Sequence, residues 1–380
     1  MDILYFPLEI FKEMFLFCDF LTKIRFRQVC KFLLNNLHVI DFYNIETKYL
    51  TKLTDDILKN HKFIKYLNAN NPKIKDVSWM NNLNELNASV DSGINQMGIQ
   101  GLNLIKLNAK YNSNIKDLRW MKNLKELDAS GNFCEINQLG ISGLDLIKLY
   151  ARDNRKIKNV IWMLNLKELD ASGDSVIYQI GINGLNLTKL NCCNNINIKD
   201  VSLMKNLKKL DASGCCGIDQ LGIEGLDLIK LNAWNNPKIK DVSWMQNLKT
   251  LNATRNSGID QMGIKGLNLR KFSAHQNSKI KNVSWMKNLK ELDAFGDCGI
   301  DQLGIQELDL IKMNAGYNEK IKNVNWMINL KELSAFGNCG IDQLGIKGLN
   351  LIKLYVRNNP KITDVSWMIS LKIFDSDLNI

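Results

Sequence analysis

Histidine, cysteine and acidic side chains are the groups in this sequence that could take part in catalysis. Its three histidines, His38, His61 and His275, lie far apart in unrelated surroundings. The sequence contains no HExxH metalloprotease motif, no GxSxG nucleophile motif and no phosphate-binding P-loop. Its regularly spaced Asp and Glu residues recur in copy after copy, whereas catalytic groups are singular. We therefore predict that the chain is not an enzyme and uses no cofactor.

Four of the nine cysteines lie close together in the sequence and could in principle hold a zinc ion: Cys192, Cys193, Cys215 and Cys216. No CxxC spacing occurs, and equivalent positions in other copies of the repeat hold Ala, Ser, Asn or Gly. We therefore expect no metal site and no disulfide framework. Reduced thiols are typical of intracellular proteins, so we predict an intracellular, cytoplasmic location.

Composition and charge limit the possible partners. Hydrophobic residues make up 45% of the 380 residues. The sequence contains no run of eighteen apolar residues, so we predict no membrane-spanning helix. The net charge is +11, and residues 63–380 carry +10 of it. Such a charge can indicate nucleic-acid binding, so the placement of the lysines decides its meaning.

The dominant feature of the chain is an internal repeat. The dipeptide Trp-Met recurs every 41 residues, once after 42, and Leu203-Met204 fills the one missing position. Each unit divides into two similar halves of about twenty residues, as in residues 104–112 and 124–132, and both halves have the form LxxLxAxxN. Eight copies of each half predict sixteen short strands between Ile64 and Asp377.

Elementary chemistry explains the conserved types within each copy. Side chains alternate along a strand, so Leu127 and Ala129 should point inward while Glu126, Asp128 and Ser130 point outward. The Asn that ends the signature should bond backbone groups of the turn that follows it. We expect the Trp-Met pair to be a buried anchor of the return path rather than an aromatic binding stripe.

This pattern closely resembles the leucine-rich repeat, LxxLxLxxN, with Ala in place of the third Leu. The resemblance covers about five-sixths of the chain. It implies an α/β solenoid, a horseshoe of about sixteen short parallel strands, in which stacked coils share one core. We assign residues 63–380 to these repeats, as eight double repeats of 41 residues.

The N-terminal segment has a different character. Apolar residues recur with helical spacing between positions 10 and 26, and Pro7 suits the first turn of a helix. The residues Phe6-Pro7-Leu8-Glu9-Ile10 and Val29-Cys30-Lys31 resemble the start and end of the F-box, although Phe6 and Leu33 depart from the usual Leu and Trp. We assign residues 1–40 to an all-α F-box-like module. Residues 41–62, where Thr54 predicts a helix start, form a linker and an N-terminal cap.

These resemblances imply a function. F-box proteins with leucine-rich repeats are substrate-recognition subunits of cullin-type ubiquitin ligases, in which the F-box binds a Skp-type adaptor and the repeats bind a protein target. The near-identical repeats also resemble those of F-box and repeat proteins of giant DNA viruses, which implies a location in the host cell. By this resemblance the adaptor-binding or module-core residues are Pro7, Leu8, Ile10, Met14, Ile24 and Val29.

The outward residues of the predicted strands form columns. In the first outward column Lys alternates with Glu from strand to strand, as in Lys106 and Glu126, and Lys209 and Thr250 are exceptions. Such a ladder fixes the strand register and cancels charge. We therefore expect a solvated face and no nucleic-acid partner on this side.

The third outward column varies between copies, which is typical of a surface adapted to a partner. Aromatic residues gather in its C-terminal half and are typical of interface hot spots. We predict that the target binds there, unless Phe295 and Phe336 instead fold over the strand edge and pack locally. The predicted target-binding residues are Trp234, His275, Phe295, Phe336 and Arg357.

Two other functions stay open at this stage. The chain could be a leucine-rich-repeat interaction scaffold with a helical cap and no ubiquitin role. The loops Lys73-Ile74-Lys75 and Lys238-Ile239-Lys240 could bind RNA, although the neighbouring Asp76 and Asp241 oppose this.

Overall fold

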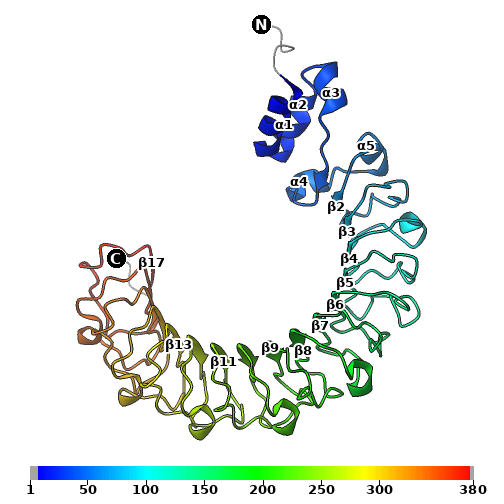
Figure 1. Ribbon diagram of the computed structural model, residues 1–380. Coiled ribbons are helices and arrows are strands. Elements are labelled where there is room, and N and C mark those ends of the chain that lie inside the picture. The colour runs from blue at the N-terminus through cyan, green and yellow to red at the C-terminus, as the bar shows by residue number, and fades with distance from the viewer. Residues whose placement is uncertain (1–6, 377–380) are drawn as a thin grey trace. The chain divides into compact units, whose positions relative to one another are not determined.

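Short parallel strands recur along the chain at the interval that the sequence predicts (Figure 1). The structure is a computed structural model that describes residues 7–376. The chain divides into two compact units. Unit 1 comprises residues 1–170 and 174–185, and unit 2 comprises residues 171–173 and 186–380.

Unit 1 begins with helices and continues with strands. The helices are α1 (Leu8–Phe17), α2 (Phe20–Arg27), α3 (Lys31–Asn36), α4 (Thr47–Leu50) and α5 (Asp55–Lys59). The strands, each paired in parallel with the next, are β1 (Asp41–Phe42), β2 (Tyr66–Asn68), β3 (Glu85–Asn87), β4 (Lys106–Asn108), β5 (Glu126–Asp128), β6 (Lys148–Tyr150) and β7 (Glu168–Asp170).

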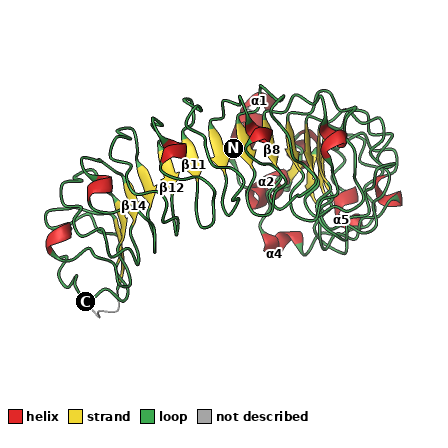
Figure 2. Ribbon diagram, turned by 90° about the horizontal axis from the view of Figure 1, so that it is seen from below, coloured by secondary structure: helices red, strands yellow, loops and turns green. Residues whose placement is uncertain are grey.

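Unit 2 consists of coils that each contribute one three-residue strand to a parallel sheet. Most of each coil is loop, with single 3₁₀ turns such as η5 (Met262–Ile264) on the return path (Figure 2). The strands are β8 (Lys189–Asn191), β9 (Lys209–Asp211), β10 (Lys230–Asn232), β11 (Thr250–Asn252), β12 (Lys271–Ser273), β13 (Glu291–Asp293), β14 (Lys312–Asn314), β15 (Glu332–Ser334), β16 (Lys353–Tyr355) and β17 (Ile373–Asp375).

The core of each coil is formed by apolar side chains from its strand and from its return path. Leu107 and Ala109 point inward from β4, and Ile115, Leu118 and Met121 complete the same coil, all fully buried. No single coil encloses a core, so the apolar area is buried only when coils stack. The predicted sixteen strands of the repeat are β2–β17, which confirms the solenoid fold.

Buried asparagines hold the turns together, as the sequence predicts. Asn154 donates from Nδ2 to the carbonyls of Ala129 and Ile136, at 2.8 and 3.1 Å. Its Oδ1 accepts from the backbone N–H groups of Lys156 and Ile157. One side chain therefore satisfies four backbone groups that no strand pairing reaches. The fully or almost fully buried members of this ladder are Asn71, Asn112, Asn154, Asn195, Asn236, Asn277, Asn318 and Asn359.

Residues 41–62 take the place of a preceding coil. The strand β1 pairs in parallel with β2, and Asn71 donates to the carbonyls of Leu50 and Leu53 as later asparagines donate to a preceding coil. The predicted helix start is confirmed, since Thr54 Oγ1 accepts from the backbone N–H of Ile57. This segment thus covers the open end of the first repeat in unit 1.

The Trp-Met pair differs from the expectation of a buried anchor. Its Met is buried in every copy, but the indoles of Trp162, Trp244 and Trp326 are each 36% exposed. The indole N–H donates to a carbonyl of the preceding half-repeat in the later copies, as from Trp120 to Leu102 at 2.9 Å, whereas Nε1 of Trp79 has no acceptor among the described residues. The Trp is therefore partly buried, and from Trp120 onward its N–H links two successive half-repeats. The expectation of a buried Trp was wrong: the Met of each pair is buried, and the Trp stays partly exposed.

None of the helices formed by residues 7–376 combines the length and the hydrophobicity that crossing a bilayer requires.

Candidate functional site

Helix α1 has two apolar sides, and only one of them is covered. Phe11 and Phe15 are buried and pack on Phe26 of α2, with ring centroids 6.2 and 6.3 Å apart. Ile10 and Met14 are 44% and 51% exposed. Phe17, one turn further along, is 88% exposed. Residues four and three positions apart share a helix face, so Ile10, Met14 and Phe17 form one exposed strip, the α1 apolar face.

The predicted adaptor-binding residues fall into two groups. Pro7, Ile10, Met14 and Val29 are exposed, and Pro7 caps the start of α1. Leu8 and Ile24 are half-buried. Phe6 lies outside the described residues. Sequence reasoning missed Phe17, which the spacing from Ile10 and Met14 could have revealed.

A polar contact joins α2 to the cap. Arg27 lies 3.2 Å from Nδ1 of His61 and also donates to the carbonyl of Leu34. Burial, together with the positive charge of Arg27, lowers the pKa of His61 to about 4. His61 is therefore neutral at physiological pH and can accept from the guanidinium.

In unit 2, four ring side chains form an aromatic cluster, one from each of four consecutive half-repeats. The rings of His275 and Phe295 lie 4.4 Å apart, and Phe336 lies 5.7 Å from Phe295. Tyr317 packs edge-on against both phenylalanines at 5.5 Å. Tyr317 is 47% exposed, and the other three members are half-buried. The cluster is thus packed within itself and still presents ring surface to a partner.

Two glycines make room for the cluster. A Cβ at Gly316 would lie 2.7 Å from the ring of Phe336, and one at Gly337 would lie 2.4 Å from the ring of Tyr317. Gly337 also has φ +64°, a backbone conformation that a side chain makes costly. The absence of a side chain at these two glycines therefore lets rings of neighbouring coils pack against the backbone and against one another.

The structure brings together three of the five predicted target-binding residues. Trp234 is half-buried, and its ring instead lies 5.6 Å from the guanidinium of Arg255. Arg357 donates to Asp375 at 2.8 Å. Sequence reasoning missed Tyr317, because its φ of +56° places a residue of the turn among the rings. The same conformation recurs one residue before the signature Asn in other copies, as at Asn235 and Gln276, but a ring at this position occurs only in some copies and its stacking depends on the neighbouring coils.

The third outward column is not outward in every strand. Where its member is Ser or Thr, the side chain is 1–6% exposed, so the expectation that Ser130 points to solvent was wrong. These small hydroxyl side chains lie against the turn, as when Ser213 donates to Asp211. Only the larger members of the column reach the surface. The buried members are Ser89, Ser130, Ser172, Ser213 and Thr254.

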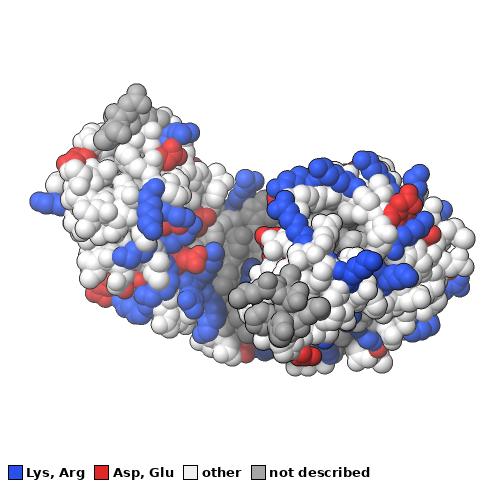
Figure 3. Space-filling view, turned by 90° about the horizontal axis from the view of Figure 1, so that it is seen from above, with Lys and Arg blue, Asp and Glu red and all other residues white. Residues whose placement is uncertain are grey.

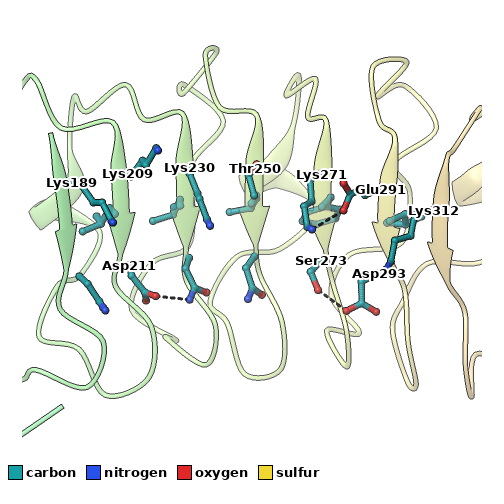
Figure 4. Close-up of a pocket in the computed structure, with 18 of the residues that line it drawn as sticks. Lys189, Lys209, Asp211, Lys230, Thr250, Lys271, Ser273, Glu291, Asp293 and Lys312 are labelled. Atoms are coloured by element: carbon teal, nitrogen blue, oxygen red, sulfur yellow. Dashed lines mark hydrogen bonds and ion pairs between the residues drawn. The ribbon is translucent and has the colours of Figure 1, made fainter. Parts of the chain in front are cut away.

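A groove of about 550 Å³ runs over the strand surface of unit 2, lined by side chains of β8–β14 (Figure 4). One row of its lining residues comes from the first outward column, and a second row contains Asn, Asp and Ser. The Leu and Phe residues of the lining are buried, so the side chains that the groove presents to solvent are those of Lys, Glu, Asp, Asn, Ser and Thr. The groove can therefore hold a polar chain by charge and hydrogen bonds.

The four clustered cysteines do not converge on one point. Cys192 and Cys216 are buried with their sulfurs 3.2 Å apart, whereas Cys193 is half-buried and Cys215 is exposed. Burial raises the pKa of the Cys192 thiol well above its usual value. Within residues 7–376, no three His, Cys, Asp or Glu side chains gather as a metal site would require.

Comparison with known proteins identifies the fold alone. No protein-family model matches the sequence, and no curated protein matches it. The structure of the mouse RP105/MD-1 complex matches with a TM-score of 0.51 and 12% sequence identity, over 91% of this chain and 68% of that chain. The TLR13–ssRNA13 complex matches with a TM-score of 0.50 and 17% identity, over 83% of this chain and 60% of that chain.

A bacterial structure is similar over a comparable length. The functional domain of InlJ from Listeria monocytogenes matches with a TM-score of 0.43 and 18% identity, over 79% of this chain and 65% of that chain. The chain thus spans less than two thirds of the InlJ and TLR13 chains. All three are leucine-rich-repeat proteins. The chain has the leucine-rich-repeat fold, a parallel solenoid.

Proposed function

We propose that this chain is the substrate-recognition subunit of a cullin-type ubiquitin ligase. In this proposal the helices α1–α3 bind a Skp-type adaptor, and the repeats bind a protein target. The observation that carries it is the α1 apolar face, because Ile10, Met14 and Phe17 stay exposed while Phe11 and Phe15 already close the helical core. The proposal places the chain in the cytoplasm, in a host cell if the chain is viral.

The energetics of the exposed face support a docking role. Covering a Leu-sized or Phe-sized side chain stabilises by about 1.5–3 kcal/mol. Three such residues on one helical face supply enough apolar contact for a specific helix-mediated interface. If α1 served only as a cap, its apolar face would be buried against the first repeat. Residues 41–62 already cover the open end of that repeat, so the α1 apolar face is not needed for capping.

On the target side, we assign binding to Trp234, His275, Phe295, Phe336 and Arg357. Three of these belong to the aromatic cluster, and exposed Tyr317 extends it. Partly exposed aromatic rings held rigidly by their neighbours lose little side-chain entropy on binding. Trp234→Ala together with Phe295→Ala should abolish target capture and leave adaptor binding intact.

The decisive experiment measures binding of the full chain to a purified Skp-type adaptor by calorimetry. Ile10→Asp and Met14→Asp should each weaken binding at least about tenfold, because each replaces a buried apolar contact by a desolvated charge. Ile57→Asp is the matched control, since Ile57 is 42% exposed on α5, outside the face. No binding by the unaltered chain, or equal loss in all three variants, would reject the ligase role.

A second candidate function is an interaction scaffold without a ubiquitin role. It is favoured by the capping contacts of residues 41–62, which any leucine-rich-repeat array needs at its open end. Under this alternative the aromatic cluster still binds a partner, but the adaptor does not bind. The calorimetric measurement therefore separates the two functions.

A further inference from the structure

Three lysines occupy neighbouring strands of the groove in unit 2. Lys189, Lys209 and Lys230 are the first residues of β8, β9 and β10 and lie directly opposite one another in the parallel register. Neighbouring strands are about 4.8 Å apart, so the three side chains start within roughly 10 Å. Figure 4 shows them side by side, with Asp211 in a separate row. We call these three residues the lysine row.

Two members of the lysine row, Lys209 and Lys230, depart from the pairing seen further along the same sheet. Lys271 lies 2.6 Å from Glu291, and Glu332 pairs with Lys312 and, at 3.7 Å, with Lys353. Among residues 7–376, no carboxylate lies within ion-pairing distance of Lys209 or Lys230. Like charges directly opposite each other destabilise a sheet. Lys209 thus costs stability at a position where five other copies have Glu.

The nearest carboxylate is turned to other partners. Asp211 accepts from Asn232 at 2.9 Å through Oδ2 and from the backbone N–H and hydroxyl of Ser213 through Oδ1. Both of its oxygens are therefore engaged by Asn232 and Ser213, and neither pairs with Lys209 or Lys230. On the far side of the row, Thr250 is neutral, and Asn252 accepts from Thr254 through Oδ1. The Nδ2 of Asn252 has no acceptor among the described residues and can donate to a ligand.

We propose that the groove binds an acidic segment of a partner protein, whose Asp or Glu carboxylates pair with Lys209 and Lys230. This deepens the proposed function, because it names the chemistry of the target, and it rests on the target-binding role of the repeats. Side chains two residues apart in an extended peptide lie about 6.7 Å apart on one side, within reach of two flexible lysines on neighbouring strands. Amide groups such as that of Asn252 can bond the peptide backbone.

The charges of the groove favour a peptide over a nucleic acid. Beyond Thr250, the groove contains Glu291, already paired with Lys271, and Asp293, which accepts from Ser273 at 2.9 Å. A continuous phosphate chain along the groove would have to pass these carboxylates. A peptide can place acidic residues over the lysine row and neutral residues over β13. The positive charge of Lys209 and Lys230 is confined to two neighbouring strands, so it suits a short acidic segment of a partner.

The test measures binding of short fluorescein-labelled probes to the full chain by fluorescence anisotropy. The probes are a peptide of alternating Glu and Ser, the same peptide with Gln in place of Glu, and a single-stranded oligouridine RNA. We expect the Glu peptide to bind, the Gln peptide to bind at least about tenfold more weakly, and added salt to weaken the Glu peptide. Lys209→Glu and Lys230→Glu should each reduce its affinity at least about tenfold.

Two controls make the result decisive. Lys209→Glu installs the residue type of the equivalent copies, so it should fold, which circular dichroism checks. Lys240→Glu makes the same change of charge on an exposed loop of unit 2 outside the groove and should leave peptide affinity within about twofold. Unchanged peptide binding by Lys209→Glu, an equal loss in Lys240→Glu, or tighter Lys209-dependent binding of the RNA would each overturn the proposal.

The same proteins distinguish this proposal from the ligase assignment. Lys209→Glu should bind the Skp-type adaptor as the unaltered chain does, because the lysine row lies in unit 2 and α1 lies in unit 1. Peptide binding without adaptor binding would reject the ligase role and keep the groove. Adaptor binding without Lys209-dependent peptide binding would reject the groove and keep the ligase role.

Discussion

The strand surfaces of the two units are built from nearly the same repeat but differ in their charges. In unit 1, Glu126 lies 2.9 Å from Lys106 and 3.5 Å from Lys148, so positive and negative residues alternate from strand to strand. In unit 2, the lysine row interrupts this alternation over β8–β10. In Figure 3, basic and acidic side chains lie side by side on the part of unit 2 that faces the viewer, at the left.

This comparison shows which part of a coil is free to change. Leu107 in unit 1 and Leu231 in unit 2 are both fully buried at equivalent positions, and every coil needs them. The outward residues beside them contribute only a few tenths of a kcal/mol each. A repeat protein can therefore alter its outward columns locally, at small cost, while its core stays uniform.

The largest expected effect tests the shared core. Asn154→Ala in unit 1 and Asn236→Ala in unit 2 each leave several buried backbone groups without a partner. Each should lower the free energy of unfolding by about 3 kcal/mol or more. Urea unfolding followed by circular dichroism measures the loss, and exposed Asn247→Ala should change it by less than about 0.5 kcal/mol. A large loss in one unit alone would contradict a common core.

The next effect tests the packing around the aromatic cluster. Gly337→Ala adds a Cβ against the ring of Tyr317 at a positive φ and should cost about 2–3 kcal/mol. Gly348→Ala has φ +81° but open space around the new Cβ, so it should cost about 1 kcal/mol. Thermal unfolding compares the two variants. Equal losses would show that the ring of Tyr317 moves away without cost.

A third, smaller effect concerns the cap end of unit 1, which has no counterpart in the repeats. His61 has a pKa of about 4 when folded, below its unfolded value near 6.5, so the unfolded chain binds its proton first. The contribution of His61 to stability is full above about pH 6.5 and declines as the pH falls toward 4.

Hydrogen exchange of α5 and the following turn between pH 7.5 and 5 measures this decline. His61→Gln keeps an acceptor for Arg27 but does not titrate, so its profile should be flatter. Superimposable profiles for the two proteins would exclude His61 as the source of the pH dependence.

The smallest effect tests the alternation of Lys and Glu in the first outward column. Lys209→Glu places a carboxylate between Lys189 and Lys230 and should raise the free energy of unfolding by a few tenths to about 1 kcal/mol. Glu126→Lys should lower it by a similar amount, and both changes should shrink at high salt. Urea midpoints at low and high salt measure the pair. A stabilising Glu126→Lys would be inconsistent with a charge ladder in unit 1.

Much of the fold could be predicted, because periodicity encodes it. The recurring LxxLxAxxN pattern predicts the strands, the buried Leu and Ala and the role of Asn154 in the turns. The extension of the α1 strip to Phe17 could have been predicted, since Phe17 continues the spacing of Ile10 and Met14, but the spacing alone does not tell which apolar side of α1 is covered. The partial exposure of the Trp in each Trp-Met pair could not, because a strict repeat is equally compatible with a buried ring and with one that lies at an edge.

The candidate sites were less predictable, because they depend on neighbouring coils. The positive φ of Tyr317 brings its ring between Phe295 and Phe336, and the ion pair with Asp375 draws Arg357 away from them. Burial of Ser130 and its four equivalents removes five of the sixteen members of the third column from the surface. The exception at Lys209 was visible in the sequence, but its lack of a carboxylate partner was not.

The sequence by itself determined the number of coils, the residues of the shared core and the asparagine ladder, because these follow from a period and from the alternation along a strand. Only the tertiary structure decided which outward side chains pair, which rings stack and which apolar residues of α1 stay uncovered. Those outcomes depend on distances between residues about twenty or forty positions apart, and a one-dimensional pattern carries no distance across coils.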